Sequence, residues 1–130
     1  MRIVTRLAQL ALGLVFGALM TFGHQASVRV GELGVPWGLA VALIGTTALL
    51  AGVRLLSRVR TDCFVVALGM LAAIAVLAFP GPGGSVLIPA NLAGTVWAFA
   101  PTVIAILVLA WPNVKPAHAA AAAPDAGSAD

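Results

Sequence analysis

The sequence has very few charged residues. Only 8% of its 130 residues are Asp, Glu, Lys or Arg, none is tyrosine, and 62% are hydrophobic. A soluble domain of this length needs far more polar residues to cover its surface, so this composition excludes one. Together with a mean hydropathy of +1.10, it indicates an integral membrane protein.

Cysteine is also scarce, and the apolar runs contain no acid, lysine or histidine. Cys63 is the only cysteine, so no intrachain disulfide can form. Titratable groups at membrane depth usually belong to ion or proton pathways, and without them the chain has no carrier for a coupling proton. No Ser-His-Asp or Cys-His arrangement with supporting context occurs either. We therefore predict no enzymatic activity, no catalytic residue and no cofactor.

The positive charge of the chain is small. Seven basic and four acidic residues give a net charge of +3, which is too little for a basic groove, so no nucleic-acid partner is expected. The excess instead fits the tendency of Lys and Arg to stay on the cytoplasmic side of a membrane. The predicted partner is the lipid bilayer of the cell membrane.

Four apolar runs predict four transmembrane helices, each with about the 20 residues that a helix needs to cross the hydrocarbon core. The predicted spans are about 5–23, 36–56, 62–79 and 91–111. Together they make one domain, residues 1–113, with an all-α fold: a transmembrane four-helix bundle with short loops. Residues 114–130 are rich in Ala and Pro and lack apolar periodicity, which predicts a disordered cytoplasmic tail.

Local signals predict details within these spans. The Pro- and Gly-rich run 80–84 ends the third span. Thr61 or Asp62 is expected to cap the start of that span, and Arg58 is spaced to pair with Asp62 if helix persists between them. Pro101, near the middle of the fourth span, predicts a kink because it removes one N–H and crowds the carbonyl four residues earlier.

Two segments allow a second interpretation. The basic start and first apolar run could be a signal peptide cleaved near Ala26, but His24 is not the small residue that the −3 position of such a site requires, so a retained span is preferred. Residues 85–89 are apolar between breakers. They could lie at the membrane interface or re-enter the bilayer, although lipid-exposed irregular backbone is not tolerated.

The positions of the basic residues predict the orientation of the chain. Arg54, Arg58 and Arg60 gather around the turn between the second and third spans. If this turn is cytoplasmic, six of the seven basic residues lie on one side and only Arg29 lies on the other. The prediction is therefore a multi-pass protein with both termini in the cytoplasm. These arginines could also hold anionic lipid heads, but setting the topology is their expected role.

Small residues recur every four positions in each span. Helices in lipid associate through close packing, which small side chains permit. The predicted packing positions are Gly13, Gly17, Gly38, Ala42, Gly69, Ala73, Gly94 and Ala98. We expect them to pack the four helices of one chain together. For Gly13 and Gly17, which form a G-x-x-x-G motif, a contact between two copies is the alternative.

Two possible sites lie near the span ends. His24 and Glu32 share a loop and could offer two metal ligands, but a third is missing and a solvated histidine is expected, so no metal site is predicted. Cys63 stands where the third span begins and could carry an acyl chain. A small apolar side chain at a helix start is the favoured interpretation.

The overall pattern resembles a family of membrane proteins. The features that carry the resemblance cover the whole chain: the arginine-rich turn 54–60, the loop 80–84, the fourth span with Trp97 and Pro101, and the Ala- and Pro-rich tail. Together they resemble the uncharacterised four-span integral membrane proteins of actinobacteria. This resemblance implies a bacterial plasma membrane and no known activity.

Two transporter families resemble the chain in part. The small multidrug exporters have a similar size, but their function depends on a glutamate in the first helix, where this chain has Gln9 and no acid. Fluoride channels use Asn and Phe side chains at membrane depth, and Asn91, Phe79 and Phe99 are similar in kind. The predicted role is a structural or accessory subunit, in a homo-oligomer or a larger membrane complex. The alternative is a small channel or transporter for a neutral or weakly polar solute.

Overall fold

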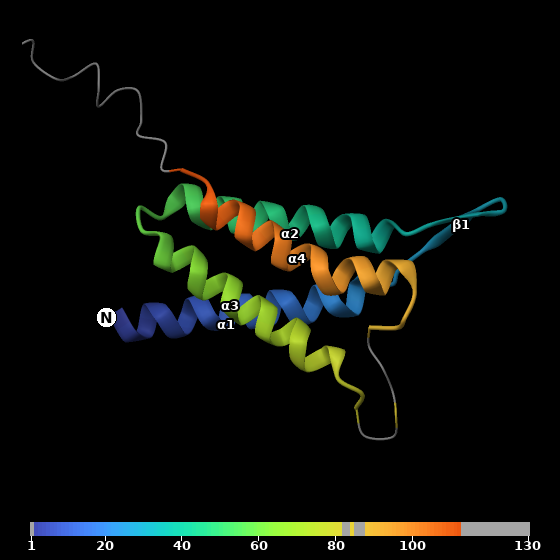
Figure 1. The fold of residues 1–130 in the computed structure, drawn as a ribbon, viewed down its shortest axis with the longest axis horizontal. Helices are drawn as coiled ribbons and strands as arrows, with labels where there is room; N and C mark the ends of the chain where they lie inside the picture. The colour runs from blue at the N-terminus through green and yellow to red at the C-terminus, as the bar shows by residue number, and fades with distance from the viewer. Residues whose placement is uncertain (1, 82–83, 85–87, 113–130) are drawn as a thin grey trace, which may run out of the picture.

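The computed structural model describes residues 2–81, 84 and 88–112, and within them it contains four long helices (Figure 1). They are α1 (Arg2–Gly23), α2 (Trp37–Leu56), α3 (Arg60–Ala78) and α4 (Leu92–Ala110). All four are long and apolar enough to cross a membrane. The predicted all-α four-helix bundle is therefore confirmed. The predicted tail, 114–130, and part of the 85–89 segment lie outside the described residues.

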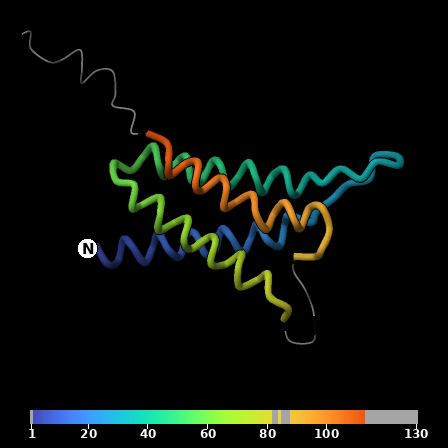
Figure 2. Tube along the Cα trace, viewed as in Figure 1, coloured from blue at the N-terminus to red at the C-terminus, as the bar shows by residue number. Residues whose placement is uncertain are grey.

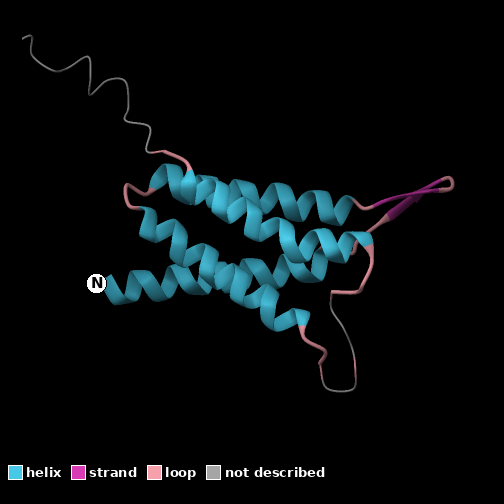
Figure 3. Cartoon of the chain, viewed as in Figure 1, coloured by secondary structure: helices cyan, strands magenta, loops and turns pink. Residues whose placement is uncertain are grey.

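A small hairpin joins α1 to α2, where the sequence predicted only a loop (Figure 3). Its strands, β1 (Val28–Val30) and β2 (Leu33–Val35), are antiparallel, and Arg29 lies opposite Gly34. The β-branched valines favour extended backbone. Gly31 provides the positive φ of 66° that the tight turn needs. Every residue of both strands is exposed.

The four helices run alternately up and down, so the bundle has two distinct ends (Figure 2). One end carries the N-terminus, the α2–α3 turn and the end of α4. We call it the arginine end, after Arg6, Arg54, Arg58 and Arg60. The opposite end carries the β-hairpin and the start of α4, and we call it the hairpin end. Helix α1 packs most extensively on α3, and α2 packs on α4.

The helix boundaries follow local backbone chemistry, with one correction. Helix α3 begins after Val59, which has an extended backbone and makes no capping side-chain bond. The predicted cap by Thr61 or Asp62 is therefore wrong, because both residues already lie inside the first turn. Helix α4 does have a side-chain cap, since Asn91 Oδ1 accepts a hydrogen bond from the N–H of Gly94 at 2.7 Å. It then continues through Pro101, where the kink stays a prediction.

Small side chains bring the backbones of α1 and α3 together. A Cβ added to Gly13 would collide with the carbonyl oxygen of Val66, and one added to Gly69 would collide with that of Leu10. A Cβ on Gly17 would lie 2.6 Å from the carbonyl oxygen of Met70 and 3.2 Å from the Cβ of Ala73. We call these contacts the α1–α3 seam. Gly13 and Gly17 thus form contacts between two helices of the same chain.

The other predicted packing residues differ in what they touch. Ala42 is buried on the inner face of α2. A Cβ on Gly38 would collide with the carbonyl of Gly23, and one on Gly94 would collide with the carbonyl of Pro89. Gly38 therefore packs against the end of α1, and Gly94 packs against the loop before its own helix. Ala98 is only partly buried. The buried stripe of α4 consists of Gly94, Trp97, Pro101 and Ala105.

Large apolar side chains point away from the bundle. Phe99, Val103 and Ile106 on α4 are all more than half exposed, as are Val15 and Leu19 on α1. In water such faces would be unstable, but lipid tails solvate them well. Small residues thus line the close helix contacts, and many large apolar side chains face outward, an arrangement that suits a surrounding of lipid.

Candidate functional sites at the two ends of the bundle

Polar and charged side chains gather at the two ends of the bundle. Between them, the fully buried residues include Leu50, Val66 and Met70, together with Thr46, whose hydroxyl donates to the carbonyl of Ala42 at 2.8 Å. No three His, Cys, Asp or Glu side chains in the described ranges approach closely enough to hold a metal ion. His24 is buried, whereas Glu32 lies at the exposed tip of the hairpin. The chemistry of the chain therefore has to be sought at the two ends.

A cluster of hydrogen-bonded side chains joins α1 to α4 at the hairpin end. It consists of Thr21, His24, Gln25, Asn91 and Trp97, and we call it the polar cluster. Trp97 Nε1 donates to Thr21 Oγ1 at 3.0 Å, and this hydroxyl donates to the carbonyl of Gly17 at 2.7 Å. Both side chains are buried. Their pairing satisfies polar groups that would otherwise destabilise the interior.

His24 is fully buried in this cluster, so the expectation of a solvated histidine is wrong. Its imidazole stacks on the indole of Trp97 and pairs through Nδ1 with the carbonyl of Thr21. A carbonyl only accepts, so Nδ1 must carry the proton. Nε2 faces the amide nitrogen of Gln25 at 2.9 Å and accepts from it. Both ring nitrogens are thus satisfied in the neutral tautomer.

These surroundings favour neutral His24. Burial lowers the pKa of His24 from its ordinary value, and the hydrogen bond to the Thr21 carbonyl only partly opposes this. A second ring proton would face the donating amide of Gln25, so protonation would also break that hydrogen bond.

Gln25 and Asn91 connect the two helices at the rim of the cluster. Asn91 Nδ2 donates to Gln25 Oε1 at 3.2 Å, and Gln25 Nε2 donates to Asn91 Oδ1 at 3.4 Å. Asn91 also caps α4. The polar cluster is therefore an internal connection whose groups bind one another. Nothing local in the sequence indicates that residues 66 or 76 positions apart would meet.

At the arginine end, Asp62 forms an ion pair with Arg6. The spacing of Arg58 and Asp62 suggested a different partner. However, helix does not persist between those two residues, because Ser57 and Val59 have extended backbones. The pairing of Asp62 instead follows from the parallel packing of α1 on α3. The Arg6 and Asp62 side chains are 40% and 22% exposed, so the ion pair is partly solvated.

The arginines of the predicted topology turn meet the end of α4. Arg54 and Arg60 each donate through Nη2 to the carbonyl oxygen of Trp111, at 3.2 Å and 3.5 Å. A basic side chain near the last carbonyls of a helix is also stabilised by the negative end of the helix dipole. Arg58 is exposed in the same turn.

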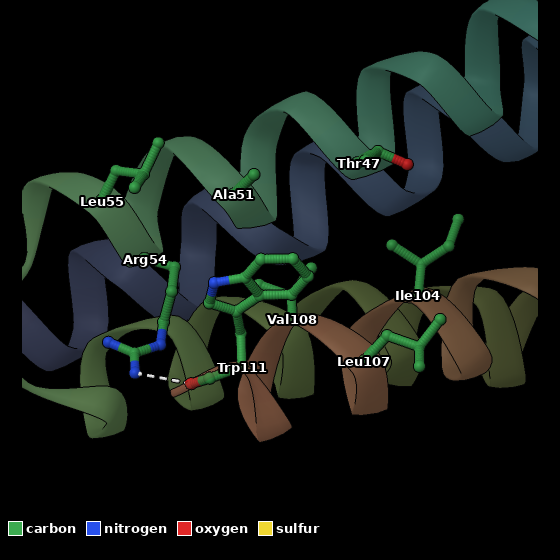
Figure 4. Close-up of a pocket in the computed structure, with 8 residues that line it drawn as sticks. All are labelled: Thr47, Ala51, Arg54, Leu55, Ile104, Leu107, Val108 and Trp111. Atoms are coloured by element: carbon green, nitrogen blue, oxygen red, sulfur yellow. Dashed lines mark hydrogen bonds between the residues drawn. The ribbon is translucent and has the colours of Figure 1, made fainter. Parts of the chain in front are cut away.

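A groove of about 570 Å³ opens between α2 and α4 beside these arginines (Figure 4). Ala51, Arg54 and Leu55 line it from α2, and Leu107 and Val108 line it from α4, together with Trp111, which follows the end of α4. The hydroxyl of Thr47, at its far end, already donates to the carbonyl of Leu43. The walls are therefore apolar, and Arg54 is the one charged side chain among the lining residues. We call this the α2–α4 groove.

A second groove, of about 360 Å³, lies between α1 and α3. Its lining residues include Leu14, Ala18 and Val76, and no charged side chain is among them. The two grooves thus differ in charge as well as in size.

Cys63 has no access to the surface in this structure. It is fully buried, and its Sγ donates to the carbonyl of Leu50 at 3.5 Å. This matches the small apolar side chain favoured from the sequence. An acyl chain on this thiol would require α2 and α3 to separate.

No protein-family model, curated protein or solved structure matches the chain. Its function must therefore be inferred from the geometry of the two ends and of the surfaces between them.

Proposed function

We propose that the protein is a non-enzymatic, multi-pass protein of the cell membrane that acts as a structural or accessory subunit of a larger membrane assembly. One observation carries the proposal: the bundle is closed at mid-depth and its large apolar side chains face outward. Trp97, Leu50 and Met70 fill the interior, and the polar groups at the hairpin end bind one another. This leaves the outward faces as the part of the protein available for contact with others.

The arginine end faces the cytoplasm in this proposal. Arg6, Arg54, Arg58 and Arg60 all lie there, and the hairpin end carries Arg29 with Glu32. Such an imbalance favours cytoplasmic termini. A reporter that is active only outside the cytoplasm should work when fused after Glu32 and stay silent when fused after Arg60. The reverse pattern would refute this orientation.

The outward face of α4 is the first place to look for a partner. Phe99 and Ile106 lie seven residues apart on the same side of the helix and are 69% and 60% exposed. A photo-reactive amino acid placed at either position in living cells should give discrete protein adducts if another subunit packs there. Val15 on the outward face of α1 provides the comparison.

Adducts to lipid alone at all three positions would contradict the accessory role. A transport assay addresses the alternative function. Purified protein in liposomes should not accelerate the release of small neutral solutes, because apolar side chains fill the interior of the described helices and the buried Thr46 already donates to the carbonyl of Ala42. Protein-dependent release would favour a channel or transporter instead.

A further inference from the structure

The α2–α4 groove is nearly as long as half of the hydrocarbon core of a membrane is thick. Its lining on α2 runs from Thr47 to Leu55, and eight residues of helix rise by about 12 Å. Half of the hydrocarbon core is about 15 Å. The groove also begins at the arginine end, where a lipid head group would lie, and continues toward mid-depth. An extended acyl chain would therefore lie along it in the direction that chains take in the bilayer.

The groove is apolar along its length and positive at its mouth. Arg54 and Arg60 both approach the carbonyl oxygen of Trp111, so two guanidinium groups converge on one point beside the opening. Asp62, in the first turn of α3, forms an ion pair with Arg6 of α1. Two converging guanidinium groups suit a phosphate, which arginine binds with paired hydrogen bonds.

The indole of Trp111 lies at this same mouth and lines the groove (Figure 4). Tryptophan is enriched at the head-group level of membranes, because its ring is apolar while its N–H needs a polar partner. An apolar channel, a tryptophan at the interface and two converging cations together match the three parts of a phospholipid: chain, glycerol region and phosphate.

We propose that the α2–α4 groove binds one acyl chain of an anionic phospholipid from the leaflet at the arginine end, with the phosphate held by Arg54 and Arg60. This site requires only that the helices cross a bilayer, and it does not depend on an accessory role. The arginines then bind lipid specifically in addition to setting the topology.

Native mass spectrometry of the purified full-length protein tests the proposal. The protein is mixed with phosphatidylglycerol or with phosphatidylcholine of the same acyl chains, so that only the head-group charge differs. We expect one phosphatidylglycerol to be retained through detergent removal, and the preference over phosphatidylcholine to be about thirtyfold, as two surface arginines at about 1 kcal/mol each can provide. Equal retention of the two lipids would overturn the proposal without any variant.

Variants then locate the site. R54Q together with R60Q should remove most of the preference, whereas R29Q at the hairpin end should leave it unchanged. A51F should fill the groove and reduce retention, whereas A18F should fill the uncharged groove between α1 and α3 without effect. If R29Q or A18F acts as strongly as its counterpart, the lipid binds elsewhere.

One further outcome concerns a second copy of the chain. If A51F changes the oligomer size in gel filtration and leaves phosphatidylglycerol retention intact, the groove is an interface between copies and the lipid proposal is wrong. Thermal unfolding of each variant shows whether the bundle still forms, and the comparison of the two lipids on the unmodified protein stands even if a variant does not fold.

Discussion

The imidazole of His24 stacks on the indole of Trp97, with ring centroids 5.6 Å apart and an angle of 18° between the planes. The two residues come from the end of α1 and the interior of α4, and both are fully buried. His24 thereby places a titratable group inside an otherwise neutral contact between two helices. The stability of this contact should depend on pH.

The pH dependence has a definite sign. Burial lowers the pKa of His24 in the folded protein below its ordinary value of 6.5, so the unfolded chain binds a proton at a higher pH than the folded chain does. The stabilisation is therefore complete above about pH 6.5 and is lost as the pH falls toward the folded pKa. The neighbours Thr21, Gln25 and Trp97 carry no group that titrates in this range.

Unfolding in detergent, measured between pH 8 and pH 5, checks this expectation. The free energy of unfolding should fall on acidification, and H24Q should flatten that part of the profile. H118Q removes the other histidine of the chain and serves as the control. If the profile of H24Q matches that of the unmodified protein, His24 does not control the pH response.

The hydrogen bond from Trp97 to Thr21 gives a second prediction. T21V leaves the buried indole N–H without its partner, which should lower the free energy of unfolding by about 1–3 kcal/mol. W97F removes the donor and some packing. In the double variant the indole N–H is absent and needs no partner. The free energy of unfolding of the double variant should therefore fall by less than the sum of the two single-variant losses. Strict additivity in this double-mutant cycle would contradict the hydrogen bond.

Alanine substitutions at Gly13, in the α1–α3 seam, and at Gly52, on α2, should affect stability differently. G13A places a methyl group against the Val66 carbonyl and should destabilise the bundle by about 1–3 kcal/mol, because the two backbones must separate. Gly52 on α2 has nothing within 4 Å of an added Cβ, so G52A should be neutral or stabilising by up to about 1 kcal/mol. Unfolding in a titration with SDS compares the two directly. Equal effects would mean that Gly13 is not at a close contact.

The ion pair between Arg6 and Asp62 should contribute little. Both side chains are partly solvated, and such pairs stabilise proteins by about 0–1 kcal/mol. A double-mutant cycle with R6Q and D62N should give a coupling energy within this range. R58Q provides the control, and its coupling to D62N should be zero. A larger coupling for Arg58 would restore the pairing that its spacing to Asp62 suggested.

The sequence predicted the helices well because each span is long and apolar throughout. The small-residue pattern also identified the inner faces of α1 and α2, where Gly13 and Gly38 are buried. It could not predict that α1 would pack on α3, because the pattern shows which face packs but not on which helix. The same limit explains His24, whose burial depends on Trp97, 73 positions later in the chain.

Two smaller differences between the predicted and the observed structure, in the hairpin and on α4, have local causes. The strands of the hairpin have three residues each, which is too short for a pattern that distinguishes strand from loop. On α4, the sequence pattern favoured Ala98 because it extends the spacing of Gly94. In the structure, the large ring of Trp97 takes the inward position instead, where it reaches both Thr21 and His24.

The α1–α3 seam has a consequence for how the protein is made. Gly13 meets its partner near Val66, more than fifty residues further along the chain. While the ribosome is still synthesising α2, the first helix has no complementary surface against which to rest. The face of α1 that carries Gly13 and Gly17 must remain covered by lipid, or by the insertion machinery, until the third helix enters the bilayer. The main contact of the first helix can therefore form only after the third helix has been made.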